Sequence, residues 1–428
     1  MKNFGKIMVV FLVLLTVTMP VFSNGEKEST KDDQISLTFM EVLTSPSRTA
    51  VIQSIIKDYE ALNPNVTIEL ISPPYEQADN KMTLMLNSEQ DLDIVEVRDH
   101  AVKQYVNNGK LTDLSPYLST WDGVNDLLPL TNSAARTIGN TPYLMPQFFF
   151  IKALFVRTDI LEEYGYTKMP ETMGEMYEMA ISITGKKADQ YGFGFRGKGN
   201  AYAISDVMIL SDVDNVSKEN FYKTEDGKFS FDNPEARQAL ANYVNLYNTA
   251  VPSDGINWGF NEQVNAFISG TTPFLIQDPD TVSLVNEQLD KDSYTVIPVP
   301  VGKSGKVYLT SGFAGLSIPS YSKKKDAAWD FIAYISSAEM NAEFCKSYGP
   351  LPVNSSSYSD DPYFSSGVYQ AWKETMSDSD TYNFVHLPFD SPKYPGWAQV
   401  QEQFMQSLLL GDITTDEAIK SWSDYWND

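Results

Sequence analysis

The chain has 428 residues, 42% of them hydrophobic and 21% charged, which allows folded cores and predicts two or three domains. Its 56 acidic and 32 basic residues give a net charge of −24. This charge argues against a nucleic-acid-binding surface, because proteins neutralise phosphates with Lys and Arg. Cys345 is the single cysteine, and His100 and His386 are the two histidines. The sequence therefore excludes an internal disulfide framework, a cysteine zinc site and a His-rich metal centre.

Residues 1–23 have the pattern of a secretory signal peptide. Lys2 and Lys6 precede an apolar run over residues 7–19, which Pro20 ends. The run is shorter than the about 20 apolar residues that a membrane-spanning helix needs. No cysteine follows it, so the signal is not that of a lipoprotein. We expect a flexible polar leader over residues 24–34 and an exported mature protein.

Strands and helices alternate along the mature chain. A strand over residues 35–40, an amphipathic helix over 48–62 and a strand over 66–70 form a βαβ unit, so these two strands are expected to be parallel. Asp226 and Gly227 predict a hairpin turn between strands over 221–223 and 229–231. Further strands are expected over 92–97, 151–156 and 274–276, and further helices over 77–86, 157–164, 172–182, from Asn233 onward, 323–337, 340–348, 397–410 and 415–426, with Thr414 or Thr415 as a cap.

Several short motifs are better explained by structure than by chemistry. Residues 192–197 match G-x-G-x-x-G, but no apolar strand precedes them, so a glycine-rich strand is favoured over a dinucleotide site. Residues 302–304 (Gly-Lys-Ser) lack the first glycine of a phosphate-binding loop and predict a hairpin turn. Residues 211–215 hint at a calcium loop but lack its glycine and glutamate, which favours a solvated loop. Cys345 is expected to be a packed core residue.

Five sequence blocks, taken in order, resemble the extracellular solute-binding proteins of bacterial ABC importers, in the family that includes maltose-binding proteins. The resemblance covers nearly all of the mature chain. Thr272, Pro273 and Phe274 depart slightly from the family's pattern, which has Ala and Met there. Because the lipid-anchoring cysteine is absent, the resemblance implies a free periplasmic protein. The blocks are residues 56–66, residues 93–95 with 109–114, residues 143–146 with 158–161, residues 267–274 and residues 348–353.

The resemblance implies a two-lobed α/β periplasmic binding protein fold of type II, in which each lobe is an open α/β sheet flanked by helices. The ligand cleft would lie between the lobes. Lobe 1 would take residues 35–147 and 311–357, and lobe 2 would take residues 148–310 and 358–428. Hinges need only a few residues at the ends of elements, and residues 148–151 and 309–312 are the expected hinges.

Ligand-binding residues are sought in the loops that follow strands and at the two crossings between lobes. A sugar offers hydroxyls in its ring plane and C–H groups on its faces, so its binding site needs paired polar groups and aromatic rings. Trp258 stands out because it lies between Asn257 and Gly259 rather than in an apolar run. The predicted ligand-binding residues are Glu41, Ser45, Glu96, Arg98, Gln147, Phe148, Trp258, Asn261, Gln277, Asp278, Asp280, Phe313 and Trp397.

The function implied is that of a non-enzymatic receptor that delivers a sugar or oligosaccharide to the membrane subunits of an ABC permease with a cytoplasmic ATPase. We expect a monomer with a carbohydrate ligand, no cofactor, no metal and no nucleic-acid partner. Two alternatives stay open. The same fold could bind a polyamine, a uronate or a polyol phosphate. A secreted carbohydrate-active enzyme would need two carboxylates about 5–10 Å apart across a glycosidic bond; a surface adhesin is a more distant third.

Overall fold

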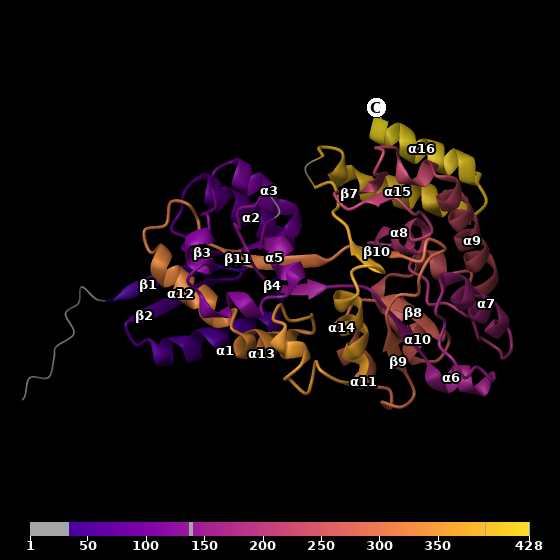
Figure 1. Ribbon diagram of the computed structural model, residues 1–428, viewed down its shortest axis with the longest axis horizontal. Coiled ribbons are helices and arrows are strands. Elements are labelled where there is room, and N and C mark those ends of the chain that lie inside the picture. The colour runs from indigo at the N-terminus through magenta and orange to yellow at the C-terminus, as the bar shows by residue number, and fades with distance from the viewer. Residues whose placement is uncertain (1–33, 137–139, 390, 428) are drawn as a thin grey trace, which may run out of the picture. The chain divides into compact units, whose positions relative to one another are not determined.

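The computed structural model describes residues 34–136, 140–389 and 391–427. The predicted signal peptide and residues 24–33 of the predicted leader lie outside the described residues. The elements that follow combine α-helices with parallel and antiparallel strands, so the chain is a mixed α/β protein (Figure 1).

Among the described residues, five strands form the first sheet, in the order β2-β1-β3-β11-β4. β1 pairs in parallel with β2 and β3, which confirms the predicted βαβ unit. β11 comes from far along the chain and inserts antiparallel between β3 and β4, so it lies among earlier strands in Figure 1. The strands are β1 (Ile35–Met40), β2 (Val66–Ile71), β3 (Ile94–Arg98), β4 (Met145–Phe150) and β11 (Gly312–Ser317).

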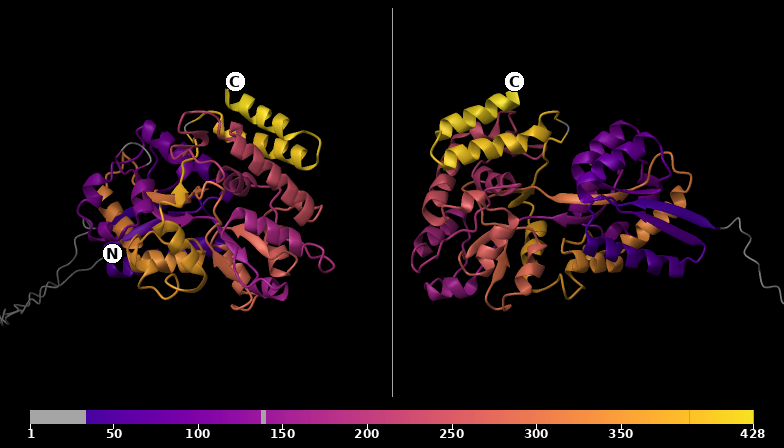
Figure 2. Two further views of the ribbon diagram at one scale, coloured as in Figure 1. Left: turned by 45° about the vertical axis from the view of Figure 1, so that its right-hand side comes forward. Right: turned by 180° about the vertical axis from the view of Figure 1, so that it is seen from behind.

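Helices from both halves of the sequence cover this sheet. α1 (Pro46–Leu62) contacts α12 (Lys325–Ile335) and α13 (Ala338–Tyr348), and the three lie side by side in Figures 1 and 2. Tyr59 of α1 meets Phe331 of α12 edge-on, with ring centroids 5.1 Å apart. The other helices of this part are α2 (Tyr75–Asn87), α3 (Asp99–Asn107), α4 (Ser115–Leu118), the 3-10 turn η2 (Asp122–Asp126) and α5 (Pro129–Ala135).

A second set of strands lies in the middle of the sequence. β5 pairs antiparallel with β8 and β9, and its four residues are buried because neighbours cover both faces. Two further pairs are β6 with β7 and β10 with β12. The strands are β5 (Ala153–Val156), β6 (Val216–Ser217), β7 (Asn220–Thr224), β8 (Phe274–Gln277), β9 (Thr295–Ile297), β10 (Val307–Leu309) and β12 (Tyr382–Phe384).

The two C-terminal helices pack on this second set rather than on the first sheet. α15 and α16 contact each other and α9, and Figure 2 shows them together along one side of it. Trp397 and Trp422 are fully buried between them. The helices are α6 (Thr158–Glu163), α7 (Met173–Ile183), α8 (Tyr202–Leu210), α9 (Pro234–Ala250), α10 (Phe260–Ile268), α11 (Thr281–Asn286), α14 (Gln370–Ser377), α15 (Tyr394–Leu409) and α16 (Thr415–Asn427), with 3-10 turns η3 (Ser230–Asp232), η4 (Gly255–Asn257), η5 (Ser356–Tyr358) and η6 (Gly367–Tyr369).

Short segments connect the two sets of strands. Ile151 and Lys152 join β4 to β5, and Thr310 and Ser311 join β10 to β11. These pairs lie within or beside the expected hinges, although Phe148 to Phe150 belong to β4. A third crossing runs from α13 to α14, where the Trp372 indole donates a hydrogen bond of 2.8 Å to the Ile151 carbonyl. The exact lobe division stays a prediction.

The helix starts agree with the sequence pattern. The Asn233 side chain accepts a hydrogen bond from the Glu235 amide at 3.0 Å, as expected for the residue before Pro234. Thr414 caps α16, because its hydroxyl accepts from the Glu417 amide at 3.3 Å while the Glu417 carboxylate accepts from the Thr414 amide at 2.8 Å. Cys345 is buried in α13, which confirms the expected core role.

Two predicted strands are wrong. Residues 229–231 do not pair along their length: Phe229 makes a single bridge to Lys223, and a 3-10 turn begins at Ser230. Within residues 192–197 only Phe193 bridges another strand residue. Gly192 explains the second case, since a Cβ there would lie 2.0 Å from the Ala180 carbonyl oxygen, so the glycine serves close packing on α7 rather than strand pairing.

The loop at residues 211–215 is also not the solvated loop that we expected. Ser211, Asp212 and Val213 are buried. The Asp212 carboxylate accepts a hydrogen bond of 2.8 Å from the Lys303 amide, which belongs to the Gly302–Ser304 segment. That segment does form a turn, as predicted, because the Gly302 amide donates to the Lys306 carbonyl at 3.0 Å. A charge pattern alone could not show that another loop would cover Asp212.

Candidate functional site

A cavity of about 630 Å³ lies between the first sheet and the second set of strands. Helices α3 and α5 and the end of β4 line it from one side, and α8, β7 and the residues after β12 line it from the other. Lys152 and residues 310–313 of the two crossings also line it. Its volume is within the range of about 300–1,000 Å³ typical of small-molecule sites. The cavity therefore gathers side chains from both parts of the molecule at the segments that join them.

Aromatic rings make up much of the cavity wall. Phe150, Tyr202, Phe384 and Phe389 line it and are half-buried, and Phe313 lines it close to the strand crossing. Strand pairing fixes two of these rings, because Phe150 lies opposite Gly312 and Phe313 lies opposite Phe149 in the β4–β11 ladder. Half-buried rings can offer their faces to the C–H groups of a ligand.

Charged side chains of both signs line the same cavity. The carboxylates are those of Asp99, Asp206, Glu219 and Asp278, and Lys152 forms an ion pair with Asp278. Lys103 and Arg136 add two further cations. The set offers both hydrogen-bond donors and acceptors around an aromatic surface.

Asp206 is the most deeply buried of these carboxylates, at 1% exposure. Its oxygens accept hydrogen bonds from the Tyr222 hydroxyl at 3.0 Å and from the Gln401 amide. Burial raises the pKa of Asp206 to about 7, and the hydrogen bonds from Gln401 and Tyr222 limit the rise. Asp206 thus joins α8, β7 and α15 at the cavity wall.

The amino-acid sequence matches the family model for bacterial extracellular solute-binding proteins over residues 45–342. The chain belongs to this family. The predicted resemblance is therefore confirmed, and so is the prediction that this solute-binding protein is a binding protein and not an enzyme.

Individual relatives support the same assignment. A putative binding protein of Brucella abortus is 23% identical over 372 residues, which cover 86% of this chain and 87% of that protein. The putative ABC transporter periplasmic-binding protein YcjN of Escherichia coli is 23% identical, over 77% of this chain and 76% of YcjN. The sugar-binding protein MalE of Xanthomonas citri superposes with a TM-score of 0.78 at 19% identity, covering 91% of this chain and 95% of MalE. The predicted α/β periplasmic binding protein fold is confirmed.

Asp278 and Phe313 are the predicted ligand-binding residues of this solute-binding protein that line the cavity. Other lining residues had escaped the sequence argument. Phe150 had a usable signal, because alternate residues of a strand share a face and Phe148 was already predicted. No sequence signal pointed to Tyr202, on α8, or to Phe389, beyond β12, since both lie in segments whose positions depend on distant contacts.

Glu41 and Glu96 lie elsewhere, fully buried on either side of Arg48. The Arg48 guanidinium donates to Glu41 at 2.7 Å and to Glu96, and it stacks over Tyr348 at 5.2 Å from the ring centroid. The amide of Val42 donates to the second Glu96 oxygen at 2.8 Å. In this structure both carboxylates hold the start of α1 against the first sheet.

Four more predicted residues are buried by their own packing. Gln147 donates to the Ser336 hydroxyl at 2.7 Å, and Gln277 donates to Gln263 at 3.1 Å. Phe148 packs edge-on against Tyr348, with ring centroids 5.5 Å apart. Trp397 is completely buried beneath the C-terminal helices.

The remaining predicted residues are partly or fully exposed outside the cavity lining. Ser45 caps α1, and Arg98 stacks over Tyr75 at 4.6 Å and pairs with Asp79 at 3.3 Å. The Trp258 indole donates a hydrogen bond of 3.1 Å to Asp254. Asn261 lies exposed on α10, and Asp280 precedes α11. Burial and the charge of Asp278 raise the pKa of Asp280 to about 6. Because Asp280 is held close to the backbone of Gly349, it lies at a contact between the two parts of the molecule.

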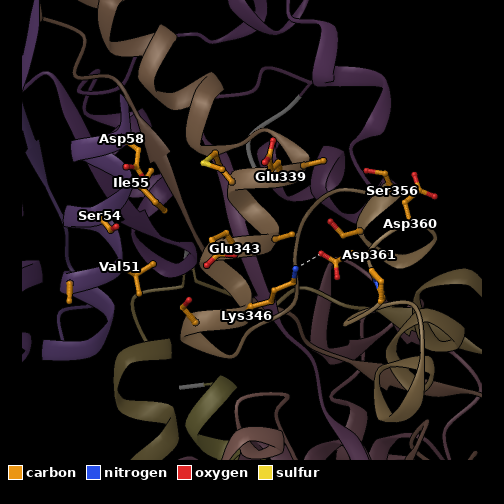
Figure 3. A pocket seen from close by; sticks show the side chains of 17 residues that line it. Val51, Ser54, Ile55, Asp58, Glu339, Glu343, Lys346, Ser356, Asp360 and Asp361 are labelled. Atoms are coloured by element: carbon orange, nitrogen blue, oxygen red, sulfur yellow. Dashed lines mark ion pairs between the residues drawn. The ribbon is translucent and has the colours of Figure 1, made fainter. Parts of the chain in front are cut away.

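A larger groove of about 1,000 Å³ lies between α1, α13 and the segment after η5 (Figure 3). Five carboxylates line it, those of Asp58, Glu339, Glu343, Asp360 and Asp361, and Lys346 forms an ion pair with Asp361 at 2.6 Å. It contains none of the predicted ligand-binding residues and no aromatic ring, so it is an acidic surface groove rather than a sugar-like site.

Within residues 34–136, 140–389 and 391–427, no group of three or more His, Cys, Asp or Glu side chains is placed to hold a metal ion. In the same part of the chain, no helix has the length and apolarity required to cross a membrane.

Proposed function

We propose that the chain is the substrate-binding subunit of an ABC importer and binds a sugar or oligosaccharide in the cavity between its two lobes. The observation that carries this proposal is the cavity itself, where half-buried rings and paired polar groups from both parts of the molecule meet at the crossings. Sugar hydroxyls suit such donors and acceptors, while the sugar's C–H faces suit the rings.

Related folds with bound ligands support the same class of solute. A MalE protein of T. maritima contains maltose, a protein of Agrobacterium vitis contains D-mannitol, and one of Thermotoga lettingae contains α-D-tagatose. These chains are 22 to 24% identical to this one, so what carries over by likeness is the fold. The choice of a sugar or polyol rests on the aromatic lining of this chain's own cavity.

In this proposal the lobes close on the ligand by bending at residues 150–152 and 310–312. Those segments connect the two parts, and all of their residues except Ile151 line the cavity, so closure would change the cavity directly. Asp278 and Phe313 would then contact the ligand together with Phe150 and Tyr202. The exported, periplasmic location and delivery to a membrane permease are parts of the same proposal, supported by the family and by relatives named as ABC-transporter binding proteins.

A polyamine is the second candidate, because four carboxylates line the cavity against three Lys and Arg side chains. A charged amine would pair with these carboxylates. A neutral sugar would instead leave the Lys152–Asp278 ion pair in place. The two candidates therefore predict different effects of salt on affinity. Polyamine binding should weaken as ionic strength rises, because its ion pairs are screened, whereas sugar binding should change little.

The test is isothermal titration calorimetry of the mature chain against maltose, mannitol, tagatose, longer oligosaccharides and spermidine, with chromatography of the added sugar. We expect saturable heat with one sugar or polyol, little salt dependence and unchanged sugar after incubation. Phe150→Leu should weaken that binding about three- to tenfold, the value of one aromatic contact. Phe229→Leu is the matched control, because Phe229 is a half-buried ring outside the cavity lining. Salt-sensitive binding of spermidine alone would overturn the carbohydrate proposal.

A further inference from the structure

A second cavity, of about 400 Å³, lies wholly within the second part of the molecule. It is lined by the start of α7, the end of α8, α9 and the turn at residues 302–305, and it shares no lining residue with the cavity between the sheets. Its volume falls in the range of small-molecule sites. Nothing in the proposed sugar function uses it.

Two sequence motifs without a role in the proposed function meet at this cavity. The Lys303 amide donates to Asp212 Oδ1 at 2.8 Å, and the Ser304 hydroxyl donates to the Ser211 carbonyl at 2.7 Å. Gly302 allows this contact, because a Cβ there would lie 2.0 Å from the Ser211 carbonyl oxygen. The turn therefore holds the Asp212 carboxylate in a fixed position at the cavity wall.

Several polar groups at this wall lack a protein partner. Asp212 is 7% exposed, and its second oxygen, Oδ2, has no hydrogen-bond partner among the described residues. The same holds for the Tyr177 hydroxyl and for the side-chain nitrogen of Asn242, whose oxygen accepts from Gln238. Burial raises the pKa of both Asp212 and Tyr177. Asp212 is buried and Tyr177 and Asn242 are half-buried, and all three line one cavity, so a ligand bound there would supply the partners that these groups lack.

Apolar side chains form another part of the wall. Met173 and Met208 line the cavity and are buried, and Ala239 lies beside them. Methionine side chains adapt their shape to a ligand's apolar part. Burial raises the pKa of Asp212 and the nearby Lys303 charge offsets part of that rise, but Lys303 is exposed and forms no ion pair with Asp212 among the described residues. A buried carboxylate opposite an apolar wall suits a ligand that has an ammonium group at the end of a short hydrocarbon chain.

We propose that this cavity is a second ligand site, which binds a small alkylamine or amino alcohol with its ammonium group on Asp212 and its stem against Met173 and Met208. Tyr177 and Asn242 would bind the hydroxyl of an amino alcohol. The site is independent of the sugar cavity, and its existence does not depend on the proposed importer function.

The test is a nuclear magnetic resonance titration of the mature chain with three compounds of one size: aminobutanol, butanediol and hydroxybutyrate. We expect saturable shifts of the Gly302, Lys303 and Gly305 amides with aminobutanol, and at least tenfold weaker effects with the neutral and anionic compounds. Asp212→Asn should weaken aminobutanol binding about tenfold, since it removes one charge-assisted hydrogen bond. The asparagine oxygen can still accept from the Lys303 amide, so the turn should survive.

Asp214→Asn is the matched control, because Asp214 is exposed and does not line the cavity. It should leave aminobutanol binding unchanged. Equal shifts with butanediol, or full binding by Asp212→Asn, would overturn the proposal. The sugar titration is a separate measurement at a separate cavity, so failure of one proposal leaves the other standing.

Discussion

Replacing Arg48 with methionine tests whether Glu41 and Glu96 are structural or ligand-binding residues. Methionine keeps much of the arginine's apolar volume but cannot donate hydrogen bonds or carry charge. Arg48 is 2% exposed, and its two carboxylate partners are fully buried. The substitution would leave two buried carboxylates without their cation, which is a strongly destabilising change.

The expected loss of stability depends on which hydrogen bonds the two carboxylates retain. Removing one member of a buried ion pair costs about 3–5 kcal/mol. Glu96 retains hydrogen bonds from the amides of Val42 and Leu43, and Glu41 retains the hydroxyls of Thr49 and Ser72. These remaining donors favour the lower end, so we expect a loss of about 3 kcal/mol in the free energy of unfolding.

Urea denaturation followed by tryptophan fluorescence and circular dichroism measures this loss. Arg237→Met is the matched control, because its ion pairs with Asp232, at 3.4 Å, and with Asp416 are both exposed and should each contribute less than about 1 kcal/mol. Adding Glu41→Gln and Glu96→Gln to Arg48→Met should recover at least half of the loss, since neutral amides need no cation. The reasoning is refuted if Arg48→Met unfolds like the control, or if the triple variant is no more stable than the single one.

Three further predictions concern Asp206, Trp372 and Thr172. The folded-state pKa of Asp206, about 7, exceeds its unfolded value of about 3.9, so the folded state holds this proton more tightly and stability falls as pH rises from about 4 to 7. In urea titrations at several pH values, Asp206 should contribute a slope of at most about 1.4 kcal/mol per pH unit to the free energy of unfolding. Asp206→Asn should remove this contribution, and an unchanged slope would contradict the burial argument. Trp372→Phe leaves the buried Ile151 carbonyl without its indole donor and should cost about 1–3 kcal/mol by the same assay, whereas a neutral result would mean that the crossing relaxes. Thr172→Ala removes the cap of α7 and should lower stability by about 1 kcal/mol, while Thr172→Ser should restore most of it; equal losses for both would exclude capping as the cause.

Much of the local structure could be predicted because its causes are local. Asn233 before Pro234 and Thr414 before Glu417 start helices through contacts within four residues of the chain. The parallel pairing of β1 with β2 follows from a strand, a helix and a strand in succession. The family resemblance rested on the order of such blocks, and it was sufficient to predict the fold.

The residues that line the cavity were harder to predict because their surroundings come from distant segments. Glu41 follows a strand, as ligand-binding carboxylates often do, yet Arg48 and Ser72 engage it. Asp278 follows a strand in the same way and reaches the cavity. Only the tertiary structure separates the two cases, since it places a buried guanidinium beside one carboxylate and an open space beside the other.

The sequence by itself determined the class of the protein: an acidic chain of alternating strands and helices, with one cysteine and the block order of a solute-binding family. Only the tertiary structure decided which rings and charges face the cavity. The physical reason is that helix caps and strand alternation depend on neighbours in sequence, whereas burial of Trp397 or exposure of Phe150 depends on which distant surface packs against it.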